Sequence, residues 1–402
     1  MRAYFLLLLA LFVDRAVTKP TKKCYAKVAY VNPNVTKING LVASVKRIHF
    51  PESEKVSNAA IAWRNQSSNS ILVAYSMIDT VNNGLIRFYE GTLHEKSMKA
   101  APLSSSKPSP YNVSLPKRYS FPHRLYKARE LKWGENSSHA ILRYTNGEDP
   151  RILYISEFEI YIVWNDLAYN NRRIHLGTIS LRPFGVNLPV VNVSIINDPR
   201  YIRGVQKNWS PFMLESSLHL EKSINPHCVI NNTLCNSTHP ECHIKFVESI
   251  SCTYSEFVSK HWEFGTPRGG SPSYRFNDSH YLGSFHSSRT ESNVKKKGFH
   301  VCSKTYYIGF YLFESREPFK LSHISKSPLV LSPPMYKGPF GKYARYIVFP
   351  TSMRIRPNAI DLVFGLNDKE VWMTTLRREK LIESMHSVED AVVRPYNPTA
   401  GT

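Results

Sequence analysis

Short apolar and aromatic runs separated by turn residues fill most of the sequence, and this succession limits the fold more than any other feature. The runs are rich in Val, Ile, Tyr and Phe and are bounded by Asn, Gly, Pro or Ser, as strands of antiparallel sheets are. Proline (26) outnumbers glycine (18), and 12% of the residues are aromatic, which also favours strands and turns over a helical bundle. We therefore expect an all-β protein. The expected strands are 71–75, 85–89, 152–155, 159–164, 174–181, 280–286, 306–313, 346–349, 360–364 and 371–376, and one helix is expected over 378–386.

A weak repeat groups these runs into five units. Each unit opens with a small-residue or proline motif and continues with two or more strands. Five units over about 380 residues give about 75 residues each, which exceeds the usual propeller blade, so we expect the excess in loops. The pattern predicts a five-bladed β-propeller that forms a single domain over 19–402, and a pair of β-sandwich domains is the alternative. The opening motifs are Asn58-Ala-Ala, Glu148-Asp-Pro, Trp209-Ser-Pro, Gly270-Ser-Pro and Phe349-Pro-Thr.

The N-terminus indicates the compartment. Arg2 precedes an apolar run over Phe5–Val13, which Asp14 and Arg15 end. The run is shorter than the roughly 20 apolar residues that span a bilayer, so it predicts a secretory signal peptide over 1–18, with an uncleaved short anchor as the alternative. No later segment reads as a transmembrane span. We expect a secreted protein or one in the lumen of the secretory pathway.

Glycosylation acceptors agree with this compartment. Their density is typical of secreted eukaryotic proteins, although each Asn-x-Ser/Thr match alone is weak. Asn208 falls in a segment that we assign below to a pocket, so we expect it to be unmodified. The nine acceptors are Asn34, Asn65, Asn112, Asn136, Asn192, Asn208, Asn231, Asn236 and Asn277.

The cysteines point to disulfides. The chain has six, an even number, and four of them lie between Cys228 and Cys252 in a polar stretch. We expect a loop insert held by local bridges, whose connectivity the spacing leaves open. Zinc is the alternative because three histidines lie nearby, but the paired Cys-x-x-Cys spacing of zinc modules is missing.

The charge balance favours an anionic ligand. Lys and Arg number 52 and Asp and Glu 31, which gives 52 − 31 = +21. No RNA-binding motif accompanies this charge, so we do not expect a nucleic-acid partner. The chain also lacks a phosphate-binding P-loop, a dinucleotide fingerprint and a Gly-x-Ser-x-Gly elbow.

The opening motifs carry the candidate site residues. Because propellers place functional groups on the loops around their centre, these motifs would bring carboxylates, cations and amides together. A carboxyl group can then protonate a glycosidic oxygen, while cations hold phosphate or a sugar oxygen. Each residue also has a structural alternative: Asp149 could cap a turn, Arg151 could pair with Glu148, and His286 could be a core histidine. The candidates are Asn58, Glu148, Asp149, Arg151, Lys207, Asn208, Arg268 and His286.

These motifs also resemble a known family. Glu148-Asp-Pro-Arg151, Lys207-Asn208 and Gly269-Gly-Ser-Pro272, followed by Tyr281-Leu-Gly-Ser-Phe-His286, are similar in type and order to the motifs of the five-bladed propeller β-mannoside enzymes. These enzymes are glycoside hydrolase family 130 and the related β-mannosyltransferases and phosphorylases. Asn58-Ala-Ala resembles the family's first-blade motif, so the resemblance extends over residues 58–365.

The resemblance implies roles for three residues. Asp149 would donate the proton, through a sugar hydroxyl, during inverting cleavage of a β-mannoside. Lys207 would contact phosphate, and His286 matches the histidine after the glycine-rich motif. Two departures, Ser271-Pro272 in place of Pro-Pro and the unaligned arginine pair Arg172 and Arg173, leave hydrolysis and transfer open beside phosphorolysis.

We therefore expect a carbohydrate-active enzyme that cleaves or transfers β-mannosides, with an oligosaccharide or glycan as substrate and phosphate or a nucleotide sugar as a further partner. A nucleotide-sugar-dependent β-mannosyltransferase and a non-catalytic glycan-binding propeller are the alternatives. No cofactor and no metal are expected; a nucleotide-sugar transferase often uses a divalent ion, which would need a further carboxylate such as Asp166.

Overall fold

The protein is built almost entirely of strands. The computed structural model describes residues 40–48, 56–63, 70–77, 85–93, 100–102, 119–120, 147–156, 159–166, 174–180, 191–196, 207–231, 244–245, 249–291, 303–329, 347–366 and 370–396. Two short helices, α2 (Glu256–His261) and α3 (Arg378–Glu383), interrupt the strands of this part. The all-β prediction is therefore confirmed. No helix among these residues is long and apolar enough to cross a bilayer. The expected signal peptide over 1–18 lies outside them.

The described strands form five sheets, which follow one another along the chain. The first sheet contains β2 (Val56–Trp63), β3 (Ser70–Met77), β4 (Leu85–Leu93), β5 (Ala100–Pro102) and β6 (Tyr119–Ser120). The second contains β7 (Gly147–Ser156), β8 (Glu159–Asp166), β9 (Ile174–Ser180), β10 (Val191–Ile196) and β14 (Ile244–Lys245). The third contains β11 (Ser210–Leu214), β12 (Ser217–Ile224), β13 (His227–Asn231), β15 (Ser249–Tyr254) and β25 (Val392–Val393). The fourth contains β16 (Arg268–Gly269), β17 (Tyr274–Arg275), β18 (His280–Glu291), β19 (Ser303–Glu314), β20 (Leu321–Ser325) and β24 (Met385–Ser387). The fifth contains β21 (Val348–Ile355), β22 (Ala359–Leu366), β23 (Glu370–Arg377) and β1 (Val42–Ile48).

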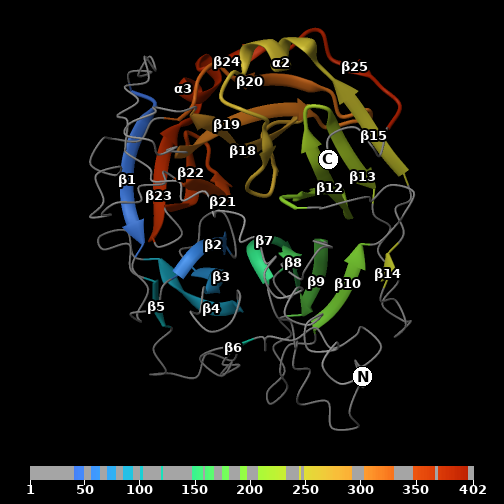
Figure 1. Cartoon of the computed structure of the whole chain (residues 1–402). Helices are drawn as coiled ribbons and strands as arrows, with labels where there is room; N and C mark the ends of the chain where they lie inside the picture. The colour runs from blue at the N-terminus through green and yellow to red at the C-terminus, as the bar shows by residue number, and fades with distance from the viewer. Residues whose placement is uncertain are drawn as a thin grey trace, which may run out of the picture.

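The opening motifs lie at the start of these sheets. Asn58 is in β2, Asp149 in β7 and Phe349 in β21, while Trp209 directly precedes β11 and Gly270 lies between β16 and β17. The five units of the sequence therefore correspond to the five sheets. In Figure 1, β2, β7, β18 and β21 lie near the middle of the molecule, and β1, β5, β14 and β25 lie at its outside. The motifs are thus gathered towards the centre.

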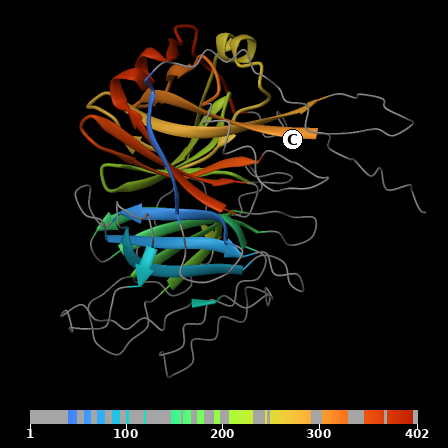
Figure 2. The ribbon, with the colours of Figure 1, turned by 90° about the vertical axis from the view of Figure 1, so that its left-hand side faces the viewer.

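The first described strand completes the last sheet. β1 pairs antiparallel with β23, from Val42 opposite Leu376 to Ile48 opposite Val371, and the two lie side by side in Figure 1. The chain therefore leaves the fifth sheet before it builds the first and returns to it after the fourth. This pairing joins the two ends of the succession of sheets, as Figure 2 shows from the side.

The C-terminal segment adds edge strands to two further sheets. After α3, β24 pairs with β20 of the fourth sheet, and β25 pairs with β15 of the third. The helix expected over 378–386 therefore ends earlier, at Glu383. Ser384 caps it by donating from Oγ to the Leu381 carbonyl at 2.5 Å, and Met385 then packs into the core at only 5% exposure. Pairing with β20 and burial of Met385 replace a further helical turn.

Neighbouring sheets share apolar cores. One core lies between the second and third sheets, another between the third and fourth, and another between the fourth and fifth. Burial of this many large side chains supplies the main stabilisation of the fold. Representative buried residues are, in that order, Val163, Trp209 and Leu220; Phe212, Phe285 and Phe313; and Leu282, Ile308 and Leu362.

Polar contacts join the remaining pairs of sheets. The first and fifth sheets meet where Thr351 Oγ1 donates to the Ala59 carbonyl at 2.5 Å and the Ile61 amide donates to Ser352 Oγ at 2.6 Å. The first and second sheets meet through β2 and β7, where the Asn58 side chain contacts Asp149. Each sheet therefore contacts the next, and the fifth contacts the first.

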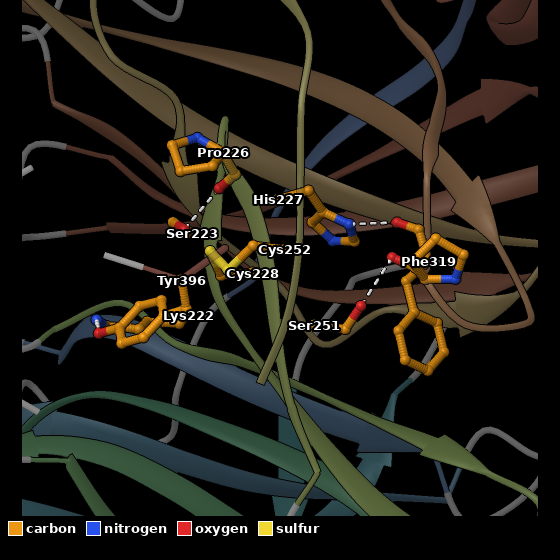
Figure 3. The surroundings of a disulfide bond; sticks show 10 residues. Lys222, Ser223, Pro226, His227, Cys228, Ser251, Cys252, Phe319 and Tyr396 are labelled. Carbon is orange, nitrogen blue, oxygen red and sulfur yellow. Dashed lines mark hydrogen bonds between the residues drawn. A yellow bond between two sulfur atoms is a disulfide. The ribbon is translucent and has the colours of Figure 1, made fainter. Parts of the chain in front are cut away.

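One disulfide lies in the third sheet. Cys228 and Cys252 are directly opposite each other in β13 and β15, and both are buried. Figure 3 shows the surroundings of the bond. The Nδ1 atom of the neighbouring His227 is hydrogen-bonded to the Phe319 carbonyl, and the Lys222 ammonium lies over the ring of Tyr396. The bridge closes the segment between the two strands, as expected for a loop insert held by a disulfide. The other four cysteines lie outside the described residues.

Removing this disulfide is expected to destabilise the protein. A Cys228→Ala, Cys252→Ala double variant should lose about 2–4 kcal/mol of unfolding free energy, because the bridge restricts the unfolded chain over a separation of 24 residues. Denaturant unfolding under non-reducing conditions measures the loss. Equal midpoints for the wild type and the double variant would contradict a stabilising role.

Candidate active site

Three polar residues with left-handed backbone open the first three sheets. Asn58, Asp149 and Asn208 have φ values of 45°, 52° and 63°. Asn and Asp adopt this region more readily than other non-glycine residues. The strand register shifts at Asn58 in β2 and at Asp149 in β7, which marks a β-bulge in each strand. Because bulges redirect side chains, the repeated conformation aims three polar groups at one place.

Amide groups hold the carboxylate of Asp149. Asn58 Nδ2 donates to Asp149 Oδ1 at 2.7 Å, and Asn165 Nδ2 donates to Asp149 Oδ2 at 3.3 Å. The same Asn165 amide reaches Asn208 Oδ1 at 3.4 Å, and its Oδ1 accepts from the Asn208 backbone amide at 2.9 Å. All four side chains are buried, with Asp149 at 9% exposure. Side chains from three sheets thus form one hydrogen-bonded row.

Arg151 lies next to this row of side chains and binds backbone carbonyls. Its guanidinium donates to Gly270 O at 2.5 Å, to Asp149 O at 2.8 Å and to Gly269 O at 3.3 Å, and it also reaches Asn208 Oδ1 at 3.4 Å. The side chain is 1% exposed. Burial lowers the pKa of Arg151 to about 10, and the charges of Asp149 and Glu148 oppose that shift. Arg151 is therefore a cation that joins the start of β7 to the glycine-rich loop.

The glycine-rich loop packs closely against Asn208. A Cβ at Gly269 would lie 2.2 Å from the Asn208 carbonyl oxygen and 2.6 Å from Ser210 Oγ, so only glycine fits there. On its other side, Ser273 Oγ donates to Glu221 Oε1 at 2.5 Å. The structure therefore fixes the loop from both sides.

Glu221 is the centre of a second buried network. Tyr311 donates to Glu221 Oε2 at 2.6 Å, and His227 Nε2 lies 2.9 Å from the same oxygen. Burial and the Glu221 charge raise the pKa of Tyr311 well above its usual value, which keeps its hydroxyl a donor. Through Ser273 this network is hydrogen-bonded to the glycine-rich loop.

Cations gather beside the row. His286 is 4% exposed, and its Nδ1 lies 3.1 Å from the Gly269 carbonyl. Burial lowers its pKa well below 6.5, and the positive charges of Arg151, Arg268 and Lys207 lower it further. Arg268 is exposed and Lys207 is half-buried. The imidazole of His286 therefore lies near three positively charged side chains, of which Arg268 is exposed to solvent.

The structure brings all eight predicted residues into one region. Asn58, Asp149, Arg151, Asn208 and His286 are connected by the contacts above. Lys207 and Arg268 act on His286, and the half-buried Glu148 acts on Arg151 through their charges. The convergence places carboxylates, amides and cations together.

Two neighbours were not predicted from the sequence. Asn165 follows the apolar run 160–164 directly, and a buried polar residue at the end of such a strand is the one signal that could have revealed it. Phe349 packs against Arg151 and His286, with its ring centroid 5.5 Å from the Arg151 guanidinium carbon and 4.5 Å from that of the His286 ring. The Phe349-Pro-Thr motif was recognised as the start of a repeat unit, but the sequence did not predict that Phe349 contacts Arg151 and His286.

Comparisons with known proteins agree on the fold. No protein-family model matches this chain, and no curated protein matches its sequence. A provisionally named glycosidase from Bacteroides thetaiotaomicron superimposes with a TM-score of 0.51 at 13% identity, over 81% of this chain and 88% of that one. A glycosyl hydrolase from Bacteroides ovatus gives 0.50 at 12% identity, over 85% and 87%. A structure from the GH130 family of mannoside phosphorylases, reported with glycoside hydrolases that target β-1,2 mannosidic linkages in Candida mannan, gives 0.50 at 13% identity, over 84% and 87%.

The chain shares the fold of these carbohydrate enzymes. The resemblance inferred from the opening motifs is thus confirmed at the level of the fold. At 12–13% identity the likeness establishes the fold alone, so the role of the site has to be argued from its own residues.

His286 should make the protein sensitive to acid. Below pH 6.5 the unfolded chain binds a proton on this histidine that the folded protein does not bind, so the unfolding free energy falls as the pH falls. The loss from one such group approaches about 1.4 kcal/mol per pH unit. Urea unfolding of the wild type and of His286→Gln between pH 7.5 and 5 measures it, and the variant should lose less stability on acidification. Parallel pH dependences for the two proteins would show that folding does not lower the pKa of His286.

Proposed function

We propose that the protein is a β-mannoside-active enzyme on a five-bladed β-propeller, with Asp149 as the proton donor. The five sheets, each in contact with the next and closed by β1 on β23, support the propeller. The observation that carries the function is the carboxylate of Asp149, fixed by two amides in the same region as the cations Lys207 and Arg268 and the imidazole of His286.

The chemistry follows from this arrangement. Asp149 gives its proton to the glycosidic oxygen, directly or through a sugar hydroxyl, while the bond from that oxygen to the anomeric carbon breaks. Phosphate attacks the anomeric carbon from the opposite face, which inverts its configuration; where water attacks instead, it releases its proton to bulk solvent. Lys207, Arg268 and the polar residues Asn58, Asn208 and Glu148 would bind phosphate or sugar oxygens. Arg151, whose donors are bound to backbone carbonyls, would hold the backbone beneath them.

Product analysis tests the proposal. The purified protein is incubated with β-mannobiose in the presence of phosphate, of GDP-mannose or of neither. Mannose 1-phosphate identifies a phosphorylase, free mannose without phosphate a hydrolase, and a longer oligosaccharide that requires GDP-mannose a transferase. No product in any arm, together with calorimetric binding of the sugar, would replace the enzyme by the glycan-binding alternative.

We also propose that residues 1–18 are a signal peptide and that 19–402 form one secreted or lumenal domain. The buried disulfide supports this compartment, because such bonds persist in oxidising environments. Mass spectrometry of the protein secreted from a eukaryotic host should find its N-terminus near residue 19. A protein that keeps residues 1–18 would be anchored instead.

Glycosylation should distinguish two acceptors in the same protein. Asn277 is exposed in a turn, whereas Asn208 is 3% exposed within the site. Peptide mapping after enzymatic glycan release should find Asn277 modified and Asn208 unmodified, and Asn277→Gln should lose the mass of one glycan. A glycan on Asn208 is incompatible with the folded site.

A further inference from the structure

Asn165 is a buried amide at the end of an apolar run in β8. It occupies the penultimate position of β8 and is 0% exposed, and the five residues that precede it, 160–164, are apolar and buried. Its backbone pairs with Glu148 on one side and with Ile174 on the other. An apolar side chain would fill such a position at lower cost if packing were its only role, because a buried amide must find partners for its polar atoms.

The partners of Asn165 are both site residues. Nδ2 donates to Asp149 Oδ2 at 3.3 Å and to Asn208 Oδ1 at 3.4 Å, while Oδ1 accepts from the Asn208 backbone amide at 2.9 Å. The group therefore acts as a donor towards the carboxylate and as an acceptor from the next sheet. The amide of asparagine offers a neutral donor and an acceptor from one short, rigid planar group. Aspartate would lose the donor, and leucine would lose both.

We propose that Asn165 is a positioning residue, which fixes the orientation of the Asp149 carboxylate and couples it to the left-handed turn at Asn208. The inference rests on the proposed function of Asp149 as proton donor. Asn58 holds Oδ1 from the first sheet and Asn165 holds Oδ2 from within the second. With both oxygens held, rotation about the bond to the carboxyl group is prevented. Without Asn165 the carboxylate keeps one contact and can turn away from the glycosidic oxygen.

The first arm of the test needs no turnover. Asn165→Asp is made in the wild type and in the Asp149→Asn background, and the thermal midpoint is followed from pH 4 to pH 8. In the wild type two buried carboxyl groups then face each other, so the folded state retains a proton that the unfolded state releases, and the midpoint falls as the pH rises. In the Asp149→Asn background this fall should be much smaller. Equal falls in both backgrounds would overturn the contact on which the inference depends.

The second arm measures catalysis with a milder variant. Asn165→Ser should lower kcat by about 100-fold with KM within about twofold, because a small displacement of a catalytic group has an effect of that order. The pH–rate limb that belongs to Asp149 should also move. Ser325→Ala is the control, since Ser325 is 5% exposed and its Oγ accepts from the Phe310 amide at 2.8 Å in the fourth sheet. It should lower the thermal midpoint and leave kcat and the pH profile unchanged.

The outcomes separate the inference from the proposed function. If Asn165→Ser and Ser325→Ala show the same kcat and pH profile, Asn165 is only a structural residue and the inference fails while the enzyme stands. If the wild type turns over no β-mannoside, the proposed function fails. The pH dependence of the two Asn165→Asp proteins then still decides whether Asn165 orients Asp149.

Discussion

Replacing Asp149 by Asn should lower β-mannoside turnover by about 1,000-fold while the protein stays folded. Loss of a general acid costs roughly 100- to 10,000-fold in rate. Asn is nearly the same size and tolerates the left-handed backbone at φ 52°. The new amide can place its oxygen where Asp149 Oδ1 was, so it still accepts the hydrogen bond from Asn58 Nδ2. Release of mannose or mannose 1-phosphate measures the rate.

The matched control for this variant is Asp278→Asn. Asp278 is exposed in the turn before β18, and its backbone carbonyl accepts hydrogen bonds from Arg275 and Ser315. The control should keep wild-type turnover and a wild-type thermal midpoint. An Asp149→Asn protein with turnover within threefold of the wild type would exclude Asp149 as the proton donor.

The strands of this protein were predictable because their signals are local. Ile71–Tyr75, for example, lies within β3, and the run Tyr306–Phe313 lies within β19. β-branched and aromatic residues between turn residues need no knowledge of the rest of the chain. Division into five units was also visible, since each first strand carries a proline or small-residue motif.

The long-range pairings were not predictable. β1 pairs with β23, more than three hundred residues away in the chain. The local pattern in Val42–Ile48 does not indicate which strand it pairs with. The sequence 378–386 reads as helix, but an available edge at β20 converts Met385–Ser387 into a strand. Both differences arise from tertiary contacts, which outweigh local propensity.

The site residues that lie in the opening motifs were predictable, including the neutral Asn58 and Asn208, whereas Asn165, which lies outside these motifs, was not. Asp149 and His286 are chemically distinctive and lie in motifs, so the sequence marked them. The amide of Asn165 has no distinctive spacing, and its role depends on the bulge that turns Asp149 towards β8. Arg151 was expected at the ligand, but the structure directs its donors to the carbonyls of Asp149, Gly269 and Gly270.

This placement of Arg151 predicts a large loss of stability in Arg151→Met. Methionine has a similar length and fills the space, but it removes the guanidinium donor from three buried backbone carbonyls and from Asn208 Oδ1, which keeps only its contact with Asn165. Breaking such a buried charged network costs about 3–5 kcal/mol. Guanidinium unfolding measures the loss, and Arg289→Met, which removes an exposed arginine from β18, should change the unfolding free energy by less than about 0.5 kcal/mol.

Arg151→Lys separates the charge of Arg151 from its geometry. Lysine keeps a positive charge beside Asp149 and Glu148, but its single ammonium cannot reach carbonyls on both β7 and the glycine-rich loop at once. It should therefore recover only part of the lost stability, and turnover should stay low because the loop that carries Gly269 is no longer fixed against Asn208. Full recovery by lysine would show that the charge alone matters. In that case Arg151 would act as a counter-ion for the carboxylates rather than as the group that joins the second sheet to the fourth.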